Sequence, residues 1–251
     1  MVIMNVVEFG KENTDIIILL HGGGLSWWNY RETAKLLEDK YRVVLPILDG
    51  HAGSDEDFTG IEQNAAEIIS YIDKEFSGFV LLIGGVSLGA QILLDILAQR
   101  NDICKYAVIE SALVCPMKLT GILVKPMLDM SYRLIGKKWF SSLQYRSLGL
   151  KAELYPEYYR DTCAITKENM TAFLRANSFY TAKDGLRAVK AKAFVFVGKK
   201  ERPIMLKSAK KLGQLLPDAK VEVLDELKHG EFSANFALRF AQTITKIIEN
   251  K

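Results

Sequence analysis

The sequence predicts an α/β fold in which helices flank a mostly parallel central sheet. Three observations indicate this fold. Short runs of apolar and β-branched residues alternate with amphipathic helical patterns, several of these runs end in glycine, and one long segment between two runs carries only helical patterns. Runs of this kind are typical of strands that are covered on both faces, as in parallel sheets. A chain of 251 residues with 49% hydrophobic residues is long enough for one such domain with an insertion.

The first part of the chain supplies most of the predicted strands. Apolar runs predict them at residues 2–9, 15–20, 41–48, 79–83 and 104–109, the first as an edge strand because it alternates only weakly. Helices are expected at residues 27–37, 61–76 and 88–98, where apolar residues recur at helical spacing. Strands and helices therefore alternate up to about residue 111.

The alternation stops at residue 112 and resumes at residue 191. The segment between shows several helical patterns separated by prolines and glycines, and connections this long in a compact domain usually have a function. Strands are then expected at residues 193–198 and 221–224, with helices at 204–216 and 235–248. The predicted organisation is a core of residues 1–111 and 191–251, with a helical insertion at 112–190.

One short motif lies between a predicted strand and the helix that follows it. Gly85, Ser87 and Gly89 fit the pattern G-x-S-x-G, in which a strained strand-to-helix turn presents the serine hydroxyl above the sheet and leaves no room for flanking side chains. The turn also directs the amide of Leu88 at a reacting carbonyl oxygen. Taken alone, the pattern also fits a glycine-rich strand end with a capping serine.

At these residues the chain resembles the α/β-hydrolase family of serine esterases and lipases. The loop His21-Gly22-Gly23-Gly24 fits the second part of an oxyanion hole, because glycines leave their amides open to a substrate oxygen. The same residues also fit a flexible turn between a strand and a helix. The resemblance implies Gly23 as the donor, with Gly24 as a further candidate. Residues 49–55 are similar to the D-x-x-G-x-G-x-S loop of the family, with Ala52 interrupting the spacing. His21 and His51 are expected to brace these loops.

A serine nucleophile needs a base, and the base needs a partner that orients it. The order in this fold is serine, acid, histidine, and of the three histidines only His229 follows Ser87. Glu201, three residues past Gly198, matches the family's G-x-x-D with glutamate in place of aspartate. Glu110, at the end of an earlier strand, is the alternative acid.

The resemblance implies that residues 112–190 form a cap over the active site. We expect hydrolysis of a small to medium carboxylic ester or thioester through an acyl-enzyme on Ser87, with no metal or organic cofactor. A carbon–carbon bond hydrolase or lyase using the same residues, and a non-catalytic ligand-binding protein with this fold, are the alternatives. Aromatic residues are dense in the insertion, and the candidates for the substrate pocket are Trp28, Trp139 and Tyr132.

The composition of the chain limits the kinds of binding partner that can be expected. A net charge of +3 predicts neither a nucleic acid nor a membrane partner, so a small-molecule acyl substrate is the expected one, and the oligomeric state is not predicted. The three cysteines follow no metal-ligand spacing, and neither a signal peptide nor an apolar stretch of about 18 residues is present, so a cytoplasmic location is expected. Residues 112–190 hold thirteen basic and six acidic side chains, which fits a solvated surface or, alternatively, attraction of an anionic substrate.

Overall fold

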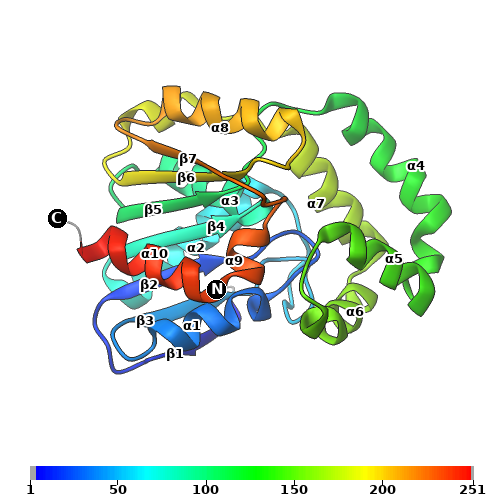
Figure 1. Ribbon diagram of the computed structural model, residues 1–251, viewed down its shortest axis with the longest axis horizontal. Helices are drawn as coiled ribbons and strands as arrows, with labels where there is room; N and C mark the ends of the chain where they lie inside the picture. The colour runs from blue at the N-terminus through cyan, green and yellow to red at the C-terminus, as the bar shows by residue number, and fades with distance from the viewer. Residues whose placement is uncertain (1–3, 250–251) are drawn as a thin grey trace.

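The computed structural model describes residues 4–249, which form a seven-stranded sheet with helices on both faces (Figure 1). The strand order is β1-β3-β2-β4-β5-β6-β7; β1 is antiparallel to β3, and all other neighbours are parallel. The fold-class prediction is therefore confirmed. The strands are β1 (Val6–Phe9), β2 (Ile16–Leu20), β3 (Arg42–Pro46), β4 (Val80–Val86), β5 (Cys104–Glu110), β6 (Lys192–Gly198) and β7 (Lys220–Leu224).

Helices cover the sheet on both sides, which explains why its central strands are apolar throughout. All five residues of β2 are buried. Alternate residues of this strand point to opposite faces, so that Ile18 belongs to the hydrophobic core on one side of the sheet and Ile17 to the core on the other side. The covering helices are α1 (Arg31–Leu37), α2 (Ile61–Phe76), α3 (Leu88–Gln99), α8 (Pro203–Leu215) and α10 (Ala237–Glu249).

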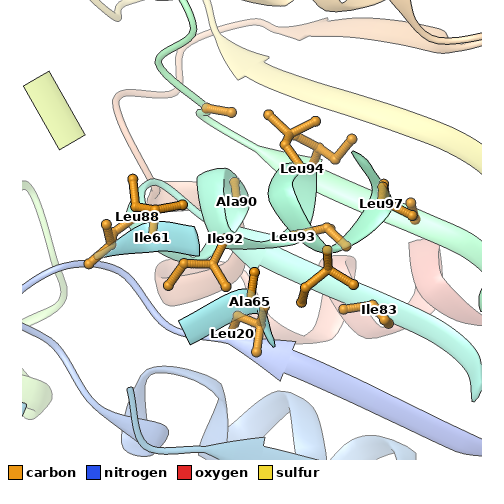
Figure 2. Packing of buried hydrophobic residues seen from close by; sticks show 14 of the residues in the cluster. Leu20, Ile61, Ala65, Ile83, Leu88, Ala90, Ile92, Leu93, Leu94 and Leu97 are labelled. Carbon is orange, nitrogen blue, oxygen red and sulfur yellow. The ribbon is translucent and has the colours of Figure 1, made fainter. Parts of the chain in front are cut away.

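The helix that follows Ser87 is the most deeply buried of these. Ten of the twelve residues of α3 are buried, because the helix lies between the sheet and α2. Figure 2 shows Ala90, Leu93 and Leu97 of α3 among side chains from the sheet and from α2. A helix that is apolar on nearly all sides must be enclosed in this way. The position of the turn at Ser87 is thus fixed from both sides.

Two predicted elements differ from the structure. The segment 27–37 begins as a 3-10 helix (Trp27–Tyr30) and continues as α1, and the closing helix is divided into α9 (Glu231–Asn235) and α10. The division has a physical reason: α9 is held at the end of β5 by hydrogen bonds to Glu110, while α10 packs along the sheet against α1. One straight helix cannot do both. The predicted first strand begins at Val6, and residues 2 and 3 lie outside the described chain.

Four α-helices and two 3-10 turns occupy the segment between β5 and β6, all of which is described. The helices are α4 (Lys118–Ile135), α5 (Lys138–Leu148), α6 (Tyr155–Ala164) and α7 (Lys167–Phe179), with the 3-10 turns at Ala152–Leu154 and Asp184–Ala188. Helices α4 to α7 lie together beyond one end of the sheet (Figure 1).

Helix α7 ties this helical insertion to the body. The Asn169 side-chain amide donates to Asp57 and its carbonyl oxygen accepts from the amide of Phe58, both at 2.9 Å. At the other end of α7, Gln91 of α3 donates to the carbonyl oxygen of Asn177. Within residues 4–249, no helix has the length and apolar character needed to cross a membrane.

Candidate active site

The turn between β4 and α3 holds Ser87 in a strained backbone conformation. Its φ is +55° and its ψ is −112°, which a residue with a side chain rarely adopts. A Cβ on Gly85 would lie 2.5 Å from the carbonyl oxygen of Gly89, and one on Gly89 would lie 2.2 Å from that of Leu20. The two glycines are required because α3 starts so close to the sheet that no side chain fits.

Ser87, His229 and Glu201 form one continuous chain of hydrogen bonds. The hydroxyl oxygen of Ser87 is 2.9 Å from Nε2 of His229, and Nδ1 of His229 is 2.6 Å from Oε2 of Glu201. Because a carboxylate only accepts hydrogen bonds, the proton of neutral His229 lies on Nδ1 and its Nε2 lone pair faces the serine. The structure thus brings together three residues that lie far apart in the sequence.

The Glu201 carboxylate is fixed from behind as well as from the histidine side. Its Oε1 accepts from the Ser111 hydroxyl and from the backbone amide of Gly198, both at 2.8 Å, and its side chain is fully buried. The extra methylene of glutamate is accommodated because the side chain folds back onto Gly198, three residues earlier. The carboxylate can therefore hold one orientation.

Ser111 is a contributor that the sequence does not single out. Besides donating to Glu201, its hydroxyl accepts from the amide of Gly230 at 3.2 Å, so it links the acid to the loop that carries His229. Its backbone is in the left-handed region, with φ +53°, which is unusual for a serine. Its place directly after a predicted strand is the one sequence signal that could have identified it.

Glu110, the alternative acid, has other partners. Its carboxylate accepts from the amides of Phe232 at 3.0 Å and Ser233 at 3.2 Å, in the first turn of α9. Burial raises the pKa of Glu110 to about 7, and the negative charge of Glu201 acts in the same direction. Glu110 therefore anchors the helix that follows His229, while Glu201 makes the direct contact with the imidazole.

The two remaining histidines brace the glycine-rich loop, in agreement with the sequence interpretation. Nε2 of His21 accepts from the amide of Leu48 and Nε2 of His51 accepts from the amide of Gly24, each at 3.1 Å. Burial lowers the pKa of His21 to about 3 and that of His51 to about 4, so both are neutral near pH 7 and can accept these bonds. The Gly24 amide is thus already used, which removes it as an oxyanion donor.

Gly23 lies beside Leu88, as an oxyanion site built from their amides would require. A Cβ on Gly23 would come within 3.6 Å of the Leu88 side chain. The first amides of a helix have no acceptor within the helix, and Leu88 is the first residue of α3. Among residues 4–249, no hydrogen bond uses the amide of Gly23. Neither amide therefore has an acceptor within residues 4–249.

Two cavities meet at Ser87 and His229. The larger has a volume of about 470 Å³ and lies between α4, α7 and the start of α8; the smaller, of about 210 Å³, lies against the glycine-rich loop and the end of α5. Apolar side chains dominate the wall of the larger cavity: Leu113, Met117, Val124, Met127, Leu128, Leu174, Ile204 and Met205. A substrate with two arms can thus extend to both sides of Ser87.

The three aromatic pocket candidates lie elsewhere, so the pocket prediction needs correction. Trp28 is buried and donates from Nε1 to Asp161 at 2.7 Å, Trp139 is 64% exposed, and the Tyr132 hydroxyl donates to the carbonyl oxygen of Ile165. None of the three walls either cavity. Trp28 thus joins the body to α6 and Tyr132 joins two parts of the insertion, whereas Trp139 faces outward; aliphatic and methionine side chains form most of the apolar wall of the larger cavity instead.

The charged groups at the cavities also come from the core. Arg202 borders the larger cavity and Lys228 the smaller, and no basic residue of 112–190 borders either of them. The basic excess of the insertion therefore does not face the site.

Comparison with known proteins agrees with the fold. A family model described as the alpha/beta hydrolase family matches residues 17–241. The chain belongs to the alpha/beta hydrolase family. A search of curated proteins finds no match.

Solved structures with the same fold include enzymes of different activities. A thermophilic esterase from Thermogutta terrifontis superposes with a TM-score of 0.80 at 15% identity, covering 98% of this chain and 93% of its own. MenH from S. aureus gives 0.77 at 17% identity, with 100% and 99% covered. The meta-cleavage product hydrolase CumD from Pseudomonas fluorescens IP01 gives 0.74 at 19% identity, with 99% and 95% covered. At these identities the similarity establishes the fold and leaves the reaction open.

Proposed function

We propose that this alpha/beta hydrolase is a serine hydrolase that cleaves a small to medium carboxylic ester or thioester. The observation that carries the proposal is the hydrogen-bonded chain from Ser87 through His229 to Glu201. A serine hydroxyl is a weak nucleophile near neutral pH, and a neutral imidazole at hydrogen-bond distance is the group that activates it.

In the proposed first step, the Ser87 oxygen attacks the carbonyl carbon while Nε2 of His229 takes the hydroxyl proton. Glu201 holds the imidazole in the required tautomer and stabilises the imidazolium that forms. The amides of Gly23 and Leu88 stabilise the negative oxygen of the tetrahedral intermediate. His229 then gives the proton to the leaving alcohol or thiol, and an acyl group remains on Ser87.

In the second step, water attacks the acyl-enzyme with His229 again acting as base. Ser87 regains its proton when the carboxylic acid leaves. The paired cavities support a substrate with one arm on each side of the carbonyl, and the apolar wall of the larger cavity favours a hydrocarbon arm there.

Turnover of p-nitrophenyl esters and acyl thioesters of increasing chain length tests the proposal. Ser87→Ala is expected to lower kcat by about 10⁴-fold or more, because it removes the group that forms the intermediate. Ser70→Ala, an exposed position on α2, is the matched control and is expected to keep full activity. Undiminished hydrolysis by a folded Ser87→Ala protein would refute the proposal.

Labelling with a fluorophosphonate separates this proposal from its alternatives. Labelling of Ser87 together with ester turnover supports the esterase. Labelling without turnover of any ester or thioester would direct the search to carbon–carbon bonds, which the same three residues can also cleave. Absence of labelling in a folded protein would indicate a ligand-binding role.

A further inference from the structure

Helix α4 carries two apolar stripes, and the protein covers only one of them. The covered stripe, with Val124, Leu128 and Ile135, is buried, and α4 packs mainly against α7. The second stripe consists of Leu119, Leu123, Met127 and Met130, which are 71%, 44%, 62% and 85% exposed. Their spacing of four, four and three residues places them along one side of the helix. We refer to these four residues as the α4 stripe.

Exposure on this scale is unusual for a helix surface. A helix that is apolar on most of its circumference is normally enclosed by other elements. Contiguous exposed apolar residues otherwise mark a surface that contacts something else. Two further large side chains, Trp139 and Leu143, are 64% and 61% exposed on α5, which begins just after the turn that follows α4. Figure 1 shows α4 and α5 at the periphery, on the side of the molecule away from α10.

The charge around the stripe indicates what kind of partner it fits. Between residues 112 and 150 the chain has six basic side chains and one acidic side chain, Asp129. Asp129 is paired with Lys125 and Lys167, whereas Lys118, Arg133, Lys137 and Lys138 form no ion pair with any residue in 4–249. Exposed apolar side chains combined with uncompensated cations are typical of helices that lie in an anionic lipid interface.

The charges of the whole chain are also divided unevenly, with an excess of basic side chains in the insertion. Residues 112–190 contain thirteen basic and six acidic side chains, while the remainder contains twenty basic and twenty-four acidic ones. A small net charge therefore conceals a positive insertion on a negative core. An anionic surface would attract the insertion and turn α4 toward itself.

The stripe is continuous with the wall of the larger cavity. Met127 belongs to both, and Thr120 and Ser131 of α4 line the same cavity that reaches Ser87. An apolar molecule could thus pass from a lipid surface along Met127 into the cavity with little exposure to water. We propose that the α4 stripe is a docking surface for an anionic lipid surface. The docking itself does not depend on the proposed hydrolysis, whereas delivery of an apolar ester from the lipid does.

Flotation with vesicles containing about equal parts of phosphatidylglycerol and phosphatidylcholine tests the docking without any substrate. The wild-type protein is expected to float with these vesicles, less with pure phosphatidylcholine, and less as salt is raised, because salt screens the attraction. The double variant Leu119→Glu/Met130→Glu is expected to bind about tenfold more weakly or worse, since it places charge in the interface.

The matched control is Leu36→Glu/Leu238→Glu, which makes the same change of charge at positions 49% and 59% exposed on α1 and α10. It is expected to bind vesicles as the wild type does. Both double variants should unfold at the wild-type temperature, because all four positions are exposed. Equal vesicle binding by the two double variants, or no binding by the wild type, would overturn the proposal. The proposal would also be overturned if the wild-type protein were a dimer and only the Leu119→Glu/Met130→Glu variant were a monomer, since a second copy of the chain would then cover the stripe.

Discussion

Replacing Glu201 by glutamine tests the assignment of the acid with almost no change of shape. Oε1 of Glu201 accepts from the backbone amide of Gly198, which can only donate, so the carbonyl oxygen of the new side chain is held there. The NH₂ group must then face Nδ1 of His229. This contact requires a lone pair on Nδ1, which moves the imidazole proton to Nε2, the atom that should accept the proton of Ser87.

The expected loss follows from that change of tautomer. Forcing the wrong tautomer in a serine–histidine–acid arrangement lowers kcat by about 10⁴-fold, so Glu201→Gln should lose on the order of 10³ to 10⁴ in kcat, with a much smaller change in KM. The assay is steady-state hydrolysis of a short p-nitrophenyl ester. Thermal unfolding should change little, because the bond to Gly198 is kept.

Glu110→Gln is the matched control for this experiment. A carbonyl oxygen in the place of Oε1 can still accept from the amide of Phe232 at 3.0 Å and from that of Ser233 at 3.4 Å, so kcat is expected to stay within about tenfold of the wild type. A larger loss for Glu110→Gln than for Glu201→Gln would refute the assignment of the acid. Equal, small losses would refute the role of both residues.

Three further results are expected. Burial raises the pKa of Glu110 from 4.5 to about 7, so the folded state binds the proton of this carboxyl more tightly than the unfolded state does. The stability that results is complete below about pH 4.5 and is lost as the pH rises to about 7, so the free energy of unfolding of the wild type relative to Glu110→Gln should fall by up to about 3 kcal/mol over that range. Chemical denaturation measures this difference, and a rise with pH would contradict the shift. Gly89→Ala should abolish folding to the native state, because the added Cβ would lie 2.2 Å from the carbonyl oxygen of Leu20. The yield of the variant and its circular dichroism measure this, and a stable variant would contradict the packing around Gly89. Thr120→Trp should shift the preferred ester to shorter chains, because Thr120 borders the larger cavity. Leu119→Trp, at the neighbouring position, should leave the preferred chain length unchanged. Identical chain-length profiles for the two variants would place the hydrocarbon arm of the substrate elsewhere.

The fold was predictable because its strands are unusual in composition. The run 16–20 is apolar at every position, and only a strand covered on both faces is buried throughout, as β2 is. Glycines at 85 and 89 likewise require the close approach that the structure shows. The division of the closing helix was not predictable, because it depends on Glu110, more than a hundred residues earlier.

The candidate site was predictable in part, from the order of its residues along the chain and from their places at the ends of strands. Chain order indicates Ser87 and His229, and strand ends leave Glu201 and Glu110 as candidate acids. The structure places Glu201 in contact with His229. The cavity walls depend on how the inserted helices pack, which periodicity does not specify. Trp28 is the clearest case: its indole is held by Asp161, 133 residues away in the sequence, and so is withdrawn from the cavity.

The central claim is that Ser87 forms a covalent intermediate, and intact-mass spectrometry with a fluorophosphonate measures this most directly. The account predicts one adduct per chain on the wild-type protein, located at Ser87 by peptide mapping. It predicts no adduct on Ser87→Ala and a labelling rate lower by at least about 10²-fold on His229→Ala, since the base would be missing. Labelling of another residue, or labelling of Ser87 at an unchanged rate without His229, would contradict the account.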